Sequence, residues 1–140
     1  MSNRLHGFWQ LKSYQERRQG VYVDTLGPSA TGFIVYSPGG RMSVLITGGQ
    51  RKLRGTWSEI SDVDKAANYD ALVAYAGRYE DLGDRVIHHV EVCWIPNWVG
   101  RPLVRAVRMI APDGLELRTV PDEQGVMLLD QIVVWQRLCD

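Results

Sequence analysis

The stretch RVIHHVEVCWIPNWVG, residues 85–100, constrains the fold of this 140-residue chain more than any other. It is rich in β-branched and aromatic residues and runs into a Pro-containing turn, a pattern typical of a long strand and a tight connection. Side chains alternate between the two faces of a strand. One face is expected to carry an apolar set with a single imidazole: Val86, His88, Val90, Val92 and Trp94. We interpret this face as pointing to a core or cavity, with His88 as its polar point.

Turn signals separate further short strands on either side of this stretch. Gly-Pro at 27–28, Ser-Pro-Gly-Gly at 37–40 and Pro-Asp-Gly at 112–114 supply the turn dihedrals. The predicted strands cover residues 7–18, 20–24, a hairpin at 32–47, the stretch from 85, and then 102–111, 115–120 and 127–138. About eight strands separated by turns predict a mainly β fold, an eight-stranded antiparallel up-and-down barrel. The length predicts a single domain over residues 1–140.

One helix is predicted over Ser58–Ala76. Ser, Glu and Asp residues in its first turns favour the exposed N–H groups and the helix dipole. Apolar residues recur at helical spacing along one side: Ala66, Tyr69, Leu72, Val73 and Ala76. Such an amphipathic helix is expected to cap or flank the sheet. Tyr69, Leu72, Val73 and Tyr75 could form a lid, and core packing of a capping helix is the simpler interpretation.

Composition excludes several classes of function. Lys plus Arg and Asp plus Glu both number 16, so a basic stripe for nucleic acid or an anionic membrane is not expected. No apolar run has the length of a membrane-spanning helix, and the first ten residues lack the apolar core of a signal peptide. Cys93 and Cys139 do not suggest a disulfide framework. We therefore expect a cytoplasmic protein without a cofactor, since no phosphate-binding, dinucleotide or nucleophile-elbow motif occurs.

The motifs of the chain resemble those of the lipocalin-like domain family, which are small stand-alone calycin-type barrels. The resemblance spans nearly the whole chain. It is carried by the segments 7–9 (GFW), 32–38 (GFIVYSP), 40–44 (GRMSV), 77–80 (GRYE), 88–91 (HHVE), 96–100 (PNWVG) and 135–138 (WQRL). The resemblance implies a barrel that holds a small ligand, and some relatives in barrel shape act as cyclases or isomerases. It also implies that Trp9 closes one barrel end and stacks on Arg137, because a guanidinium stacks well on an indole.

Two candidate polar groups face the predicted interior. If residues 94–101 connect two antiparallel strands, His88 lies opposite Val107 and Val90 lies opposite Arg105. His88 and Arg105 then lie diagonally on one face. An inward guanidinium is costly unless it is paired. Arg105 could therefore anchor an oxygenated ligand while His88 acts as a hydrogen-bonding or acid/base group. Tyr36 and Tyr79 are the further polar points of this pocket, and with His88 and Arg105 they are the candidate catalytic residues if the protein is an enzyme. Alternatively, the four side chains could form an internal network that only satisfies itself.

The remaining candidate residues form the expected wall and mouth of a pocket. The predicted ligand-binding residues are Met42, Val44, Val90, Asn97, Trp98, Leu103 and Val107. Asn97 and Trp98 fall in a loop, where exposed residues often contact ligands. Trp98 could equally plug the barrel end.

The adjacent residues His88 and His89 do not predict a metal site. Neighbouring strand residues point to opposite faces and cannot chelate one ion together. We expect His89 to pair on the surface with Glu91.

The function that these residues favour is binding of a small, largely apolar molecule that carries an oxygenated group. The alternative is a cofactor-independent cyclase, isomerase or dehydratase acting on a polyketide-like or other natural-product substrate in the lumen. A third class is an interaction module whose barrel interior is filled. The volume of the interior separates the third class from the first two. A homodimer is an open alternative for the assembly.

Overall fold

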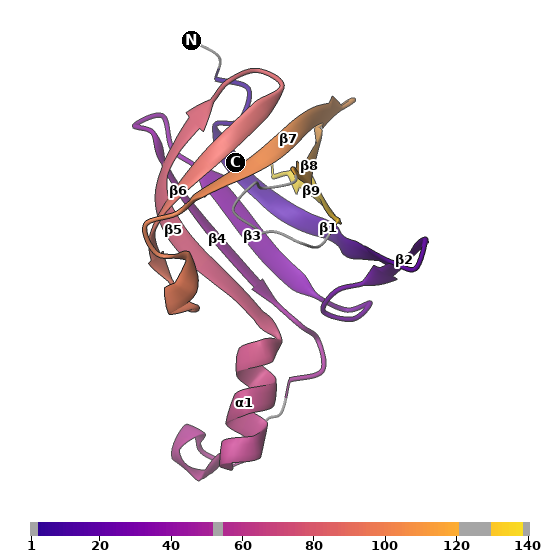
Figure 1. Ribbon diagram of the computed structural model, residues 1–140, viewed down its shortest axis with the longest axis vertical. Coiled ribbons are helices and arrows are strands. Elements are labelled where there is room, and N and C mark those ends of the chain that lie inside the picture. The colour runs from indigo at the N-terminus through magenta and orange to yellow at the C-terminus, as the bar shows by residue number, and fades with distance from the viewer. Residues whose placement is uncertain (1–2, 52–54, 121–129, 139–140) are drawn as a thin grey trace.

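The computed structural model describes residues 3–51, 55–120 and 130–138, and within these ranges nine strands form one antiparallel sheet (Figure 1). The strands are β1 (Gly7–Arg18), β2 (Val21–Asp24), β3 (Thr31–Tyr36), β4 (Arg41–Thr47), β5 (Leu72–Asp81), β6 (Arg85–Cys93), β7 (Pro102–Ile110), β8 (Gly114–Thr119) and β9 (Gln131–Arg137). The helical elements are η1 (Trp57–Glu59), α1 (Asp62–Asp70) and η2 (Pro96–Trp98). Residues 127–129 of the predicted last strand and Cys139 lie outside the described residues.

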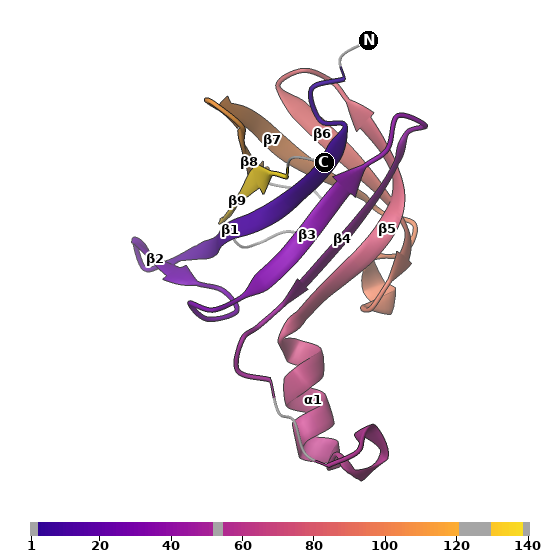
Figure 2. The ribbon, with the colours of Figure 1, turned by 180° about the vertical axis from the view of Figure 1, so that it is seen from behind.

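Eight of the strands close into a barrel. They follow one another in chain order from β1 through β3 to β9, and the sheet closes where β1 pairs with β9. The strand β2 pairs antiparallel with Gln15–Arg18 at the end of β1. The two form a hairpin that projects beyond the barrel (Figure 2). The prediction of an eight-stranded antiparallel up-and-down barrel with one helix is confirmed.

The predicted helix over Ser58–Ala76 is wrong at both ends, since α1 begins only at Asp62, after the separate turn η1. The helix α1 ends at Asp70, and residues from Leu72 onward form β5. Leu72 and Val73 fit a helical stripe with Tyr69, yet Val73 and Tyr75 also alternate at the strand period. Pairing with β4 and β6 satisfies the backbone of this segment on both sides, so the sheet determines its conformation. The predicted count of eight barrel strands agrees with the structure only because two errors cancel. The short strand β2, which lies outside the barrel, was counted, and β5, which belongs to it, was predicted as part of the helix.

The helix α1 does not cover the sheet. None of its residues is buried, and it extends away from the barrel (Figure 1). Ser61 caps its first turn by accepting a hydrogen bond from the Asp64 N–H at 3.2 Å. Tyr69 donates to the Trp94 carbonyl at 3.0 Å, which ties the helix to the end of β6. Both interpretations of Tyr69 with residues 72, 73 and 75 are therefore wrong: the last three belong to a barrel strand and form no lid, and α1 has no buried residue and so does not pack as a capping helix.

The inner face of β6 is interrupted by an irregularity in its pairing with β5. Ala76 pairs with Val92, whereas Gly77 pairs with Val90, so one extra residue of β6 lies between the two pairs. Val86, His88 and Val90 point inward as predicted. Val92 does not, because the extra residue turns it outward, and it is 69% exposed.

One end of the barrel is closed by Trp9, as the family resemblance implies. The Trp9 side chain is fully buried, and its indole Nε1 donates to the Leu5 carbonyl at 3.0 Å. The Arg137 guanidinium carbon lies 4.1 Å from the centre of the Trp9 ring. The same guanidinium donates to the carbonyls of Arg4 and His6, both at 2.5 Å, so it joins the N-terminal segment to the last strand.

Within the described ranges, every helix is too short or too polar to span a lipid bilayer.

Candidate functional site

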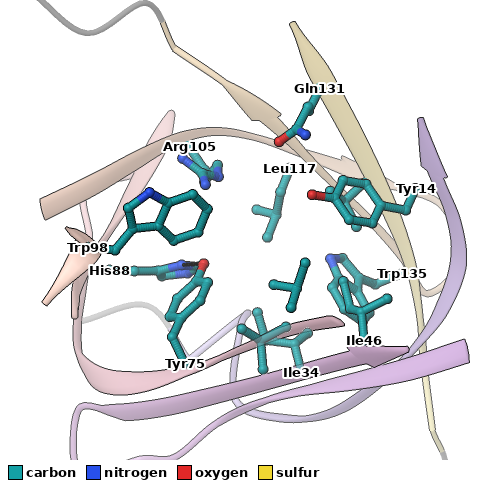
Figure 3. A pocket seen from close by; sticks show the side chains of 13 residues that line it. Tyr14, Ile34, Ile46, Tyr75, His88, Trp98, Arg105, Leu117, Gln131 and Trp135 are labelled. Carbon is teal, nitrogen blue, oxygen red and sulfur yellow. Dashed lines mark hydrogen bonds between the residues drawn. The ribbon is translucent and has the colours of Figure 1, made fainter. Parts of the chain in front are cut away.

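A small cavity lies inside the barrel and is lined by side chains from all eight barrel strands and from η2 (Figure 3). It is lined by Tyr14, Ile34, Val44, Ile46, Val73, Tyr75, His88, Trp98, Arg105, Leu117, Gln131, Val133 and Trp135. Its volume is about 40 Å³. A water molecule needs roughly 10–15 Å³ of such volume, so the space holds only a few water molecules or one small polar group.

His88 lies between two tyrosine hydroxyls. Its Nε2 is 2.7 Å from the Tyr36 hydroxyl, and its Nδ1 is 2.7 Å from the Tyr75 hydroxyl. The three side chains come from β6, β3 and β5, and all are buried. In the sheet, His88 pairs with Tyr79 of β5 and Leu103 of β7. Both nitrogens of the imidazole are therefore occupied by protein groups.

Burial keeps this row of side chains uncharged. Burial, with smaller contributions from the positive charge of Arg105 and from His89, lowers the pKa of His88 to about 3. Burial also raises the pKa of Tyr36 well above its usual value and raises that of Tyr75. At neutral pH, His88 is a neutral imidazole between two neutral phenols.

The depressed pKa of His88 predicts that acid destabilises the fold through this residue. Between pH 6.5 and about 3 the unfolded chain protonates at His88 and the folded chain does not. The free energy of unfolding should therefore decrease as the pH is lowered through this window. His88 contributes at most about 1.4 kcal/mol per pH unit to that decrease. Urea unfolding of the wild type and of His88→Gln over this pH range measures the contribution of His88, because the variant lacks the imidazole.

The matched control for this prediction is Ile87→Val, on the other face of the same strand, which removes no ionisable group and should keep the wild-type pH dependence. Parallel stability curves for the wild type and His88→Gln would show that His88 titrates normally in the folded protein.

Arg105 is the second inward polar group and is only 7% exposed. Its Nη1 donates to the Val104 carbonyl at 3.1 Å. No carboxylate of the described residues lies within ion-pair distance of this guanidinium. A buried cation without a counter-ion is strongly disfavoured, so among the residues that the structure describes the charge of Arg105 remains uncompensated.

The strand register around Arg105 differs from the predicted one. Arg105 lies opposite Val86, and His88 lies opposite Leu103, where Val90 and Val107 were predicted. The connection between β6 and β7 begins earlier than expected, because Val90 already exchanges backbone hydrogen bonds with Gly100 and Arg101. The shift is an even number of residues, which keeps every side chain on its face. His88 and Arg105 therefore still lie diagonally on the inner face, as predicted.

The opposite wall of the cavity carries a polar pair that the sequence prediction missed. Tyr14 of β1 and Gln131 of β9 lie across the cavity from His88 (Figure 3). Burial raises the pKa of Tyr14 to about 12, and Arg105 and a hydrogen bond from Gln131 oppose this rise. Simple alternation places Tyr14 on the face opposite Trp9. A bulge between Leu11 and Ser13 turns it inward instead.

The predicted site residues divide into those on the cavity wall and those beside it. Val44, His88, Trp98 and Arg105 line the cavity. The others do not: Tyr36, Met42, Val90 and Leu103 are buried in the surrounding core, Val107 is partly buried against it, and Asn97 is exposed. Tyr79 donates to the Ser37 carbonyl at 2.8 Å, away from His88, although its ring packs on Tyr36 with 4.8 Å between ring centres.

Several lining residues were missed by the sequence prediction. Tyr75 and Val73 were assigned to the helix, which hid them. Ile34 and Ile46 belong to the alternating pattern of the predicted hairpin, and that pattern was the signal that could have found them.

The outer face of β6 forms surface ion pairs that differ from the predicted His89–Glu91 pair. The His89 Nε2 lies 2.6 Å from a carboxylate oxygen of Glu80. Glu91 instead pairs with Arg41 at 2.8 Å and with Arg78 at 3.3 Å. In the described ranges, no three His, Cys, Asp or Glu side chains gather where they could hold a metal ion.

Comparison with known families agrees with this architecture. The family model described as "Lipocalin-like domain" matches residues 6–138. The chain belongs to the lipocalin-like domain family. The match covers all nine strands of this lipocalin-like protein, including the closing strands β1 and β9. No functionally curated protein matches its sequence.

Solved structures resemble this lipocalin-like chain only distantly. An uncharacterized protein from Bacteroides eggerthii is 13% identical with a TM-score of 0.48, and 96% of this chain and 99% of that chain are covered. A variant of the fluorescent protein UnaG is 12% identical with a TM-score of 0.45 and full coverage of both chains. A Helicobacter pylori protein of the lipocalin family is 15% identical with a TM-score of 0.41, covering 97% of this chain and 84% of that one.

Proposed function

We propose that this lipocalin-like barrel binds a small, largely apolar molecule in its lumen and holds an oxygenated group of that molecule at Arg105. The observation that carries the proposal is the buried guanidinium on the cavity wall, which lacks a carboxylate partner within the described residues. A ligand oxygen in the cavity would supply the missing hydrogen-bond acceptor and counter-charge. The apolar lining, which includes Val44, Ile46 and Leu117, would contact the rest of the ligand.

The small volume of the cavity limits how such a ligand enters. About 40 Å³ admits the polar group, whereas a typical ligand pocket has roughly 300–1,000 Å³. Trp98 is the lining residue that can move at least cost, because it lies in the short turn η2 between β6 and β7 and not in a barrel strand. Its indole packs edge-on against Tyr75 and Trp94, at 6.2 and 5.3 Å between ring centres. We propose that Trp98 gives way when the apolar part of a ligand enters.

The enzymatic alternative, a cyclase, isomerase or dehydratase without a cofactor, needs a side chain that moves a proton. His88 is poorly suited to that role, because a pKa of about 3 makes it a weak base and both ring nitrogens are hydrogen-bonded to tyrosines. The geometry therefore favours binding over catalysis by His88.

The small interior also favours a second candidate, an interaction module that recognises a partner with its outer surface. Phe8, Phe33 and Leu45 are exposed on the outer face of β1, β3 and β4, the wall seen in Figure 2. Phe33 pairs with Leu45 in the register of β3 and β4. A barrel that binds none of a range of small molecules in its lumen would support this second function.

The first proposal predicts that Arg105→Met removes ligand affinity without harming the fold. With hexanoate as the probe, we expect the affinity to fall at least about tenfold, because the charge-assisted hydrogen bond to the carboxylate is lost. The free energy of unfolding should stay the same or rise by about 1–4 kcal/mol, because an apolar side chain of similar volume replaces an uncompensated charge. Titration followed by tryptophan fluorescence, together with urea unfolding, measures both quantities.

The control variant is Arg108→Met on the same strand. Arg108 is exposed and pairs with Glu116 at 3.1 Å, so its loss should change neither affinity nor stability appreciably. Equal hexanoate affinities for the wild type and Arg105→Met would remove Arg105 as the anchor.

A further inference from the structure

The side chains of Tyr36, His88 and Tyr75 form a row joined by two hydrogen bonds. Which group donates and which accepts in each bond, the direction of the row, follows from the number of donors and acceptors that each group has. A neutral imidazole has one N–H donor and one bare nitrogen that accepts. The Tyr36 hydroxyl contacts Nε2 and the Tyr75 hydroxyl contacts Nδ1, both at 2.7 Å. One hydroxyl therefore donates to His88 and the other accepts from it.

The surroundings of the two hydroxyls differ. Tyr36 is fully buried, and in the described structure its hydroxyl has His88 as its hydrogen-bond partner and no other. If the Tyr36 oxygen accepted from His88, its own O–H would be buried without an acceptor, and buried donors without partners are rare and costly. Tyr75 lines the cavity, so its hydroxyl can meet a partner there.

The row therefore runs from Tyr36 to the cavity. Tyr36 donates to Nε2, the Nδ1–H of His88 donates to the Tyr75 oxygen, and the Tyr75 O–H is left to point into the cavity. Arg105 on the same side of the cavity is also a donor with no acceptor capacity. This side of the lumen thus offers hydrogen-bond donors together with one positive charge.

We infer that Tyr75 is a specificity-determining residue of the lumen and that the group it selects, with Arg105, is an acceptor without donors, best met by a carboxylate. Tyr36 and His88 are positioning residues, which fix the Tyr75 oxygen as an acceptor from the protein and so leave its proton for the ligand. This inference rests on the proposed binding function for the identity of the ligand group. The direction of the hydrogen-bond row does not depend on any ligand.

The direction of the row is tested by the tautomer of His88 in the free protein. Long-range ¹H–¹⁵N correlation spectra of protein with ¹⁵N-labelled imidazoles distinguish a protonated from a bare ring nitrogen. The chain has three histidines, and loss of one signal set in His88→Gln assigns His88. We expect protonated Nδ1 and bare Nε2. A protonated Nε2 would overturn the inference whatever the protein binds.

The selected ligand group is tested with three probes that share a six-carbon chain: hexanoate, hexan-1-ol and hexylamine. At neutral pH these present an acceptor, a mixed group and a donor. We expect the wild type to bind hexanoate at least about tenfold more tightly than hexylamine. Tyr75→Phe should lower the hexanoate affinity by roughly tenfold or more, the size of one hydrogen bond to a charged group, and should leave hexan-1-ol less affected.

The matched control is Tyr79→Phe, because the Tyr79 hydroxyl donates to the Ser37 carbonyl and not to the cavity. It should retain the preference for hexanoate. Hexylamine binding as tightly as hexanoate, or an unchanged preference in Tyr75→Phe, would overturn the inference while the binding function stands; the polar anchor would then be the Tyr14–Gln131 wall. If none of the three probes binds, the proposed function fails, and the tautomer still decides the direction of the row.

Discussion

Trp9→Ala is expected to lower the free energy of unfolding by about 3–5 kcal/mol, a large part of the roughly 5–15 kcal/mol that stabilises a typical domain. Trp9 has no exposed surface and belongs to the core that closes one end of the barrel. Truncation leaves a cavity of indole size, frees the Leu5 carbonyl from its hydrogen bond and removes the surface on which Arg137 stacks. Urea unfolding followed by circular dichroism measures the loss.

The chain offers a matched control for this change in Trp57, which begins η1 and is 84% exposed. Trp57→Ala should change the free energy of unfolding by no more than about 0.5 kcal/mol. A small effect at Trp9 would mean that the barrel end stays closed without the indole, and the structural role given to Trp9 would be wrong.

Gly77→Ala is expected to be the most damaging conservative change in the sheet, costing about 3 kcal/mol or more. Gly77 sits where β5 passes the irregularity in β6, and a Cβ atom there would overlap the His89 carbonyl oxygen. That atom belongs to the backbone and cannot swing aside. The strands would have to separate next to His88, so the site should be disturbed together with the fold.

Thermal unfolding of Gly77→Ala, compared with Gly39→Ala, measures this cost. Gly39 lies in the turn between β3 and β4, where a Cβ atom would approach only the Ser37 Oγ, at 3.9 Å. Gly39→Ala should therefore unfold within a few degrees of the wild type. Equal melting temperatures for the two variants would show that β5 and β6 can separate at Gly77 without loss of stability.

Local signals predicted most of the barrel. The bounds of the strand at 7–18 agree with β1, and the strand predicted at 102–111 differs from β7 by one residue. Turn signals such as Ser37-Pro38-Gly39-Gly40 place the ends of strands because few residues adopt their dihedrals. These features depend on neighbouring residues alone, so they can be predicted from the sequence.

The segment 58–76 shows where local reasoning failed. Its apolar residues satisfy a helical and a strand period at once, and the two periods cannot be told apart over a short run. The strand pairing of Leu72–Asp81 with β4 and β6 decided the outcome. Because Tyr75 lies in this segment, the same error hid the residue that completes the polar side of the cavity.

Bulges explain the other errors at the site. An extra residue in β1 turns Tyr14 into the lumen, and an extra residue in β6 turns Val92 out of it. Beyond each bulge, the side chains that simple alternation assigns to one face of the strand lie on the other. Neither residue type nor spacing in the sequence predicts where such a bulge occurs. The register of β6 against β7 was also wrong, but the even shift kept His88 and Arg105 on the inner face.

By itself the sequence determined the class of fold, the ends of most strands and the inward direction of His88 and Arg105, because turn dihedrals and the two-residue period are properties of adjacent residues. Only the tertiary structure decided that His88 lies between Tyr36 and Tyr75, that Arg105 lacks a carboxylate partner in the described structure, and that about 40 Å³ is free between them. These features arise from side chains on strands far apart in the chain. Their distances depend on register, bulges and closure of the sheet, which are set by the packing of the whole barrel.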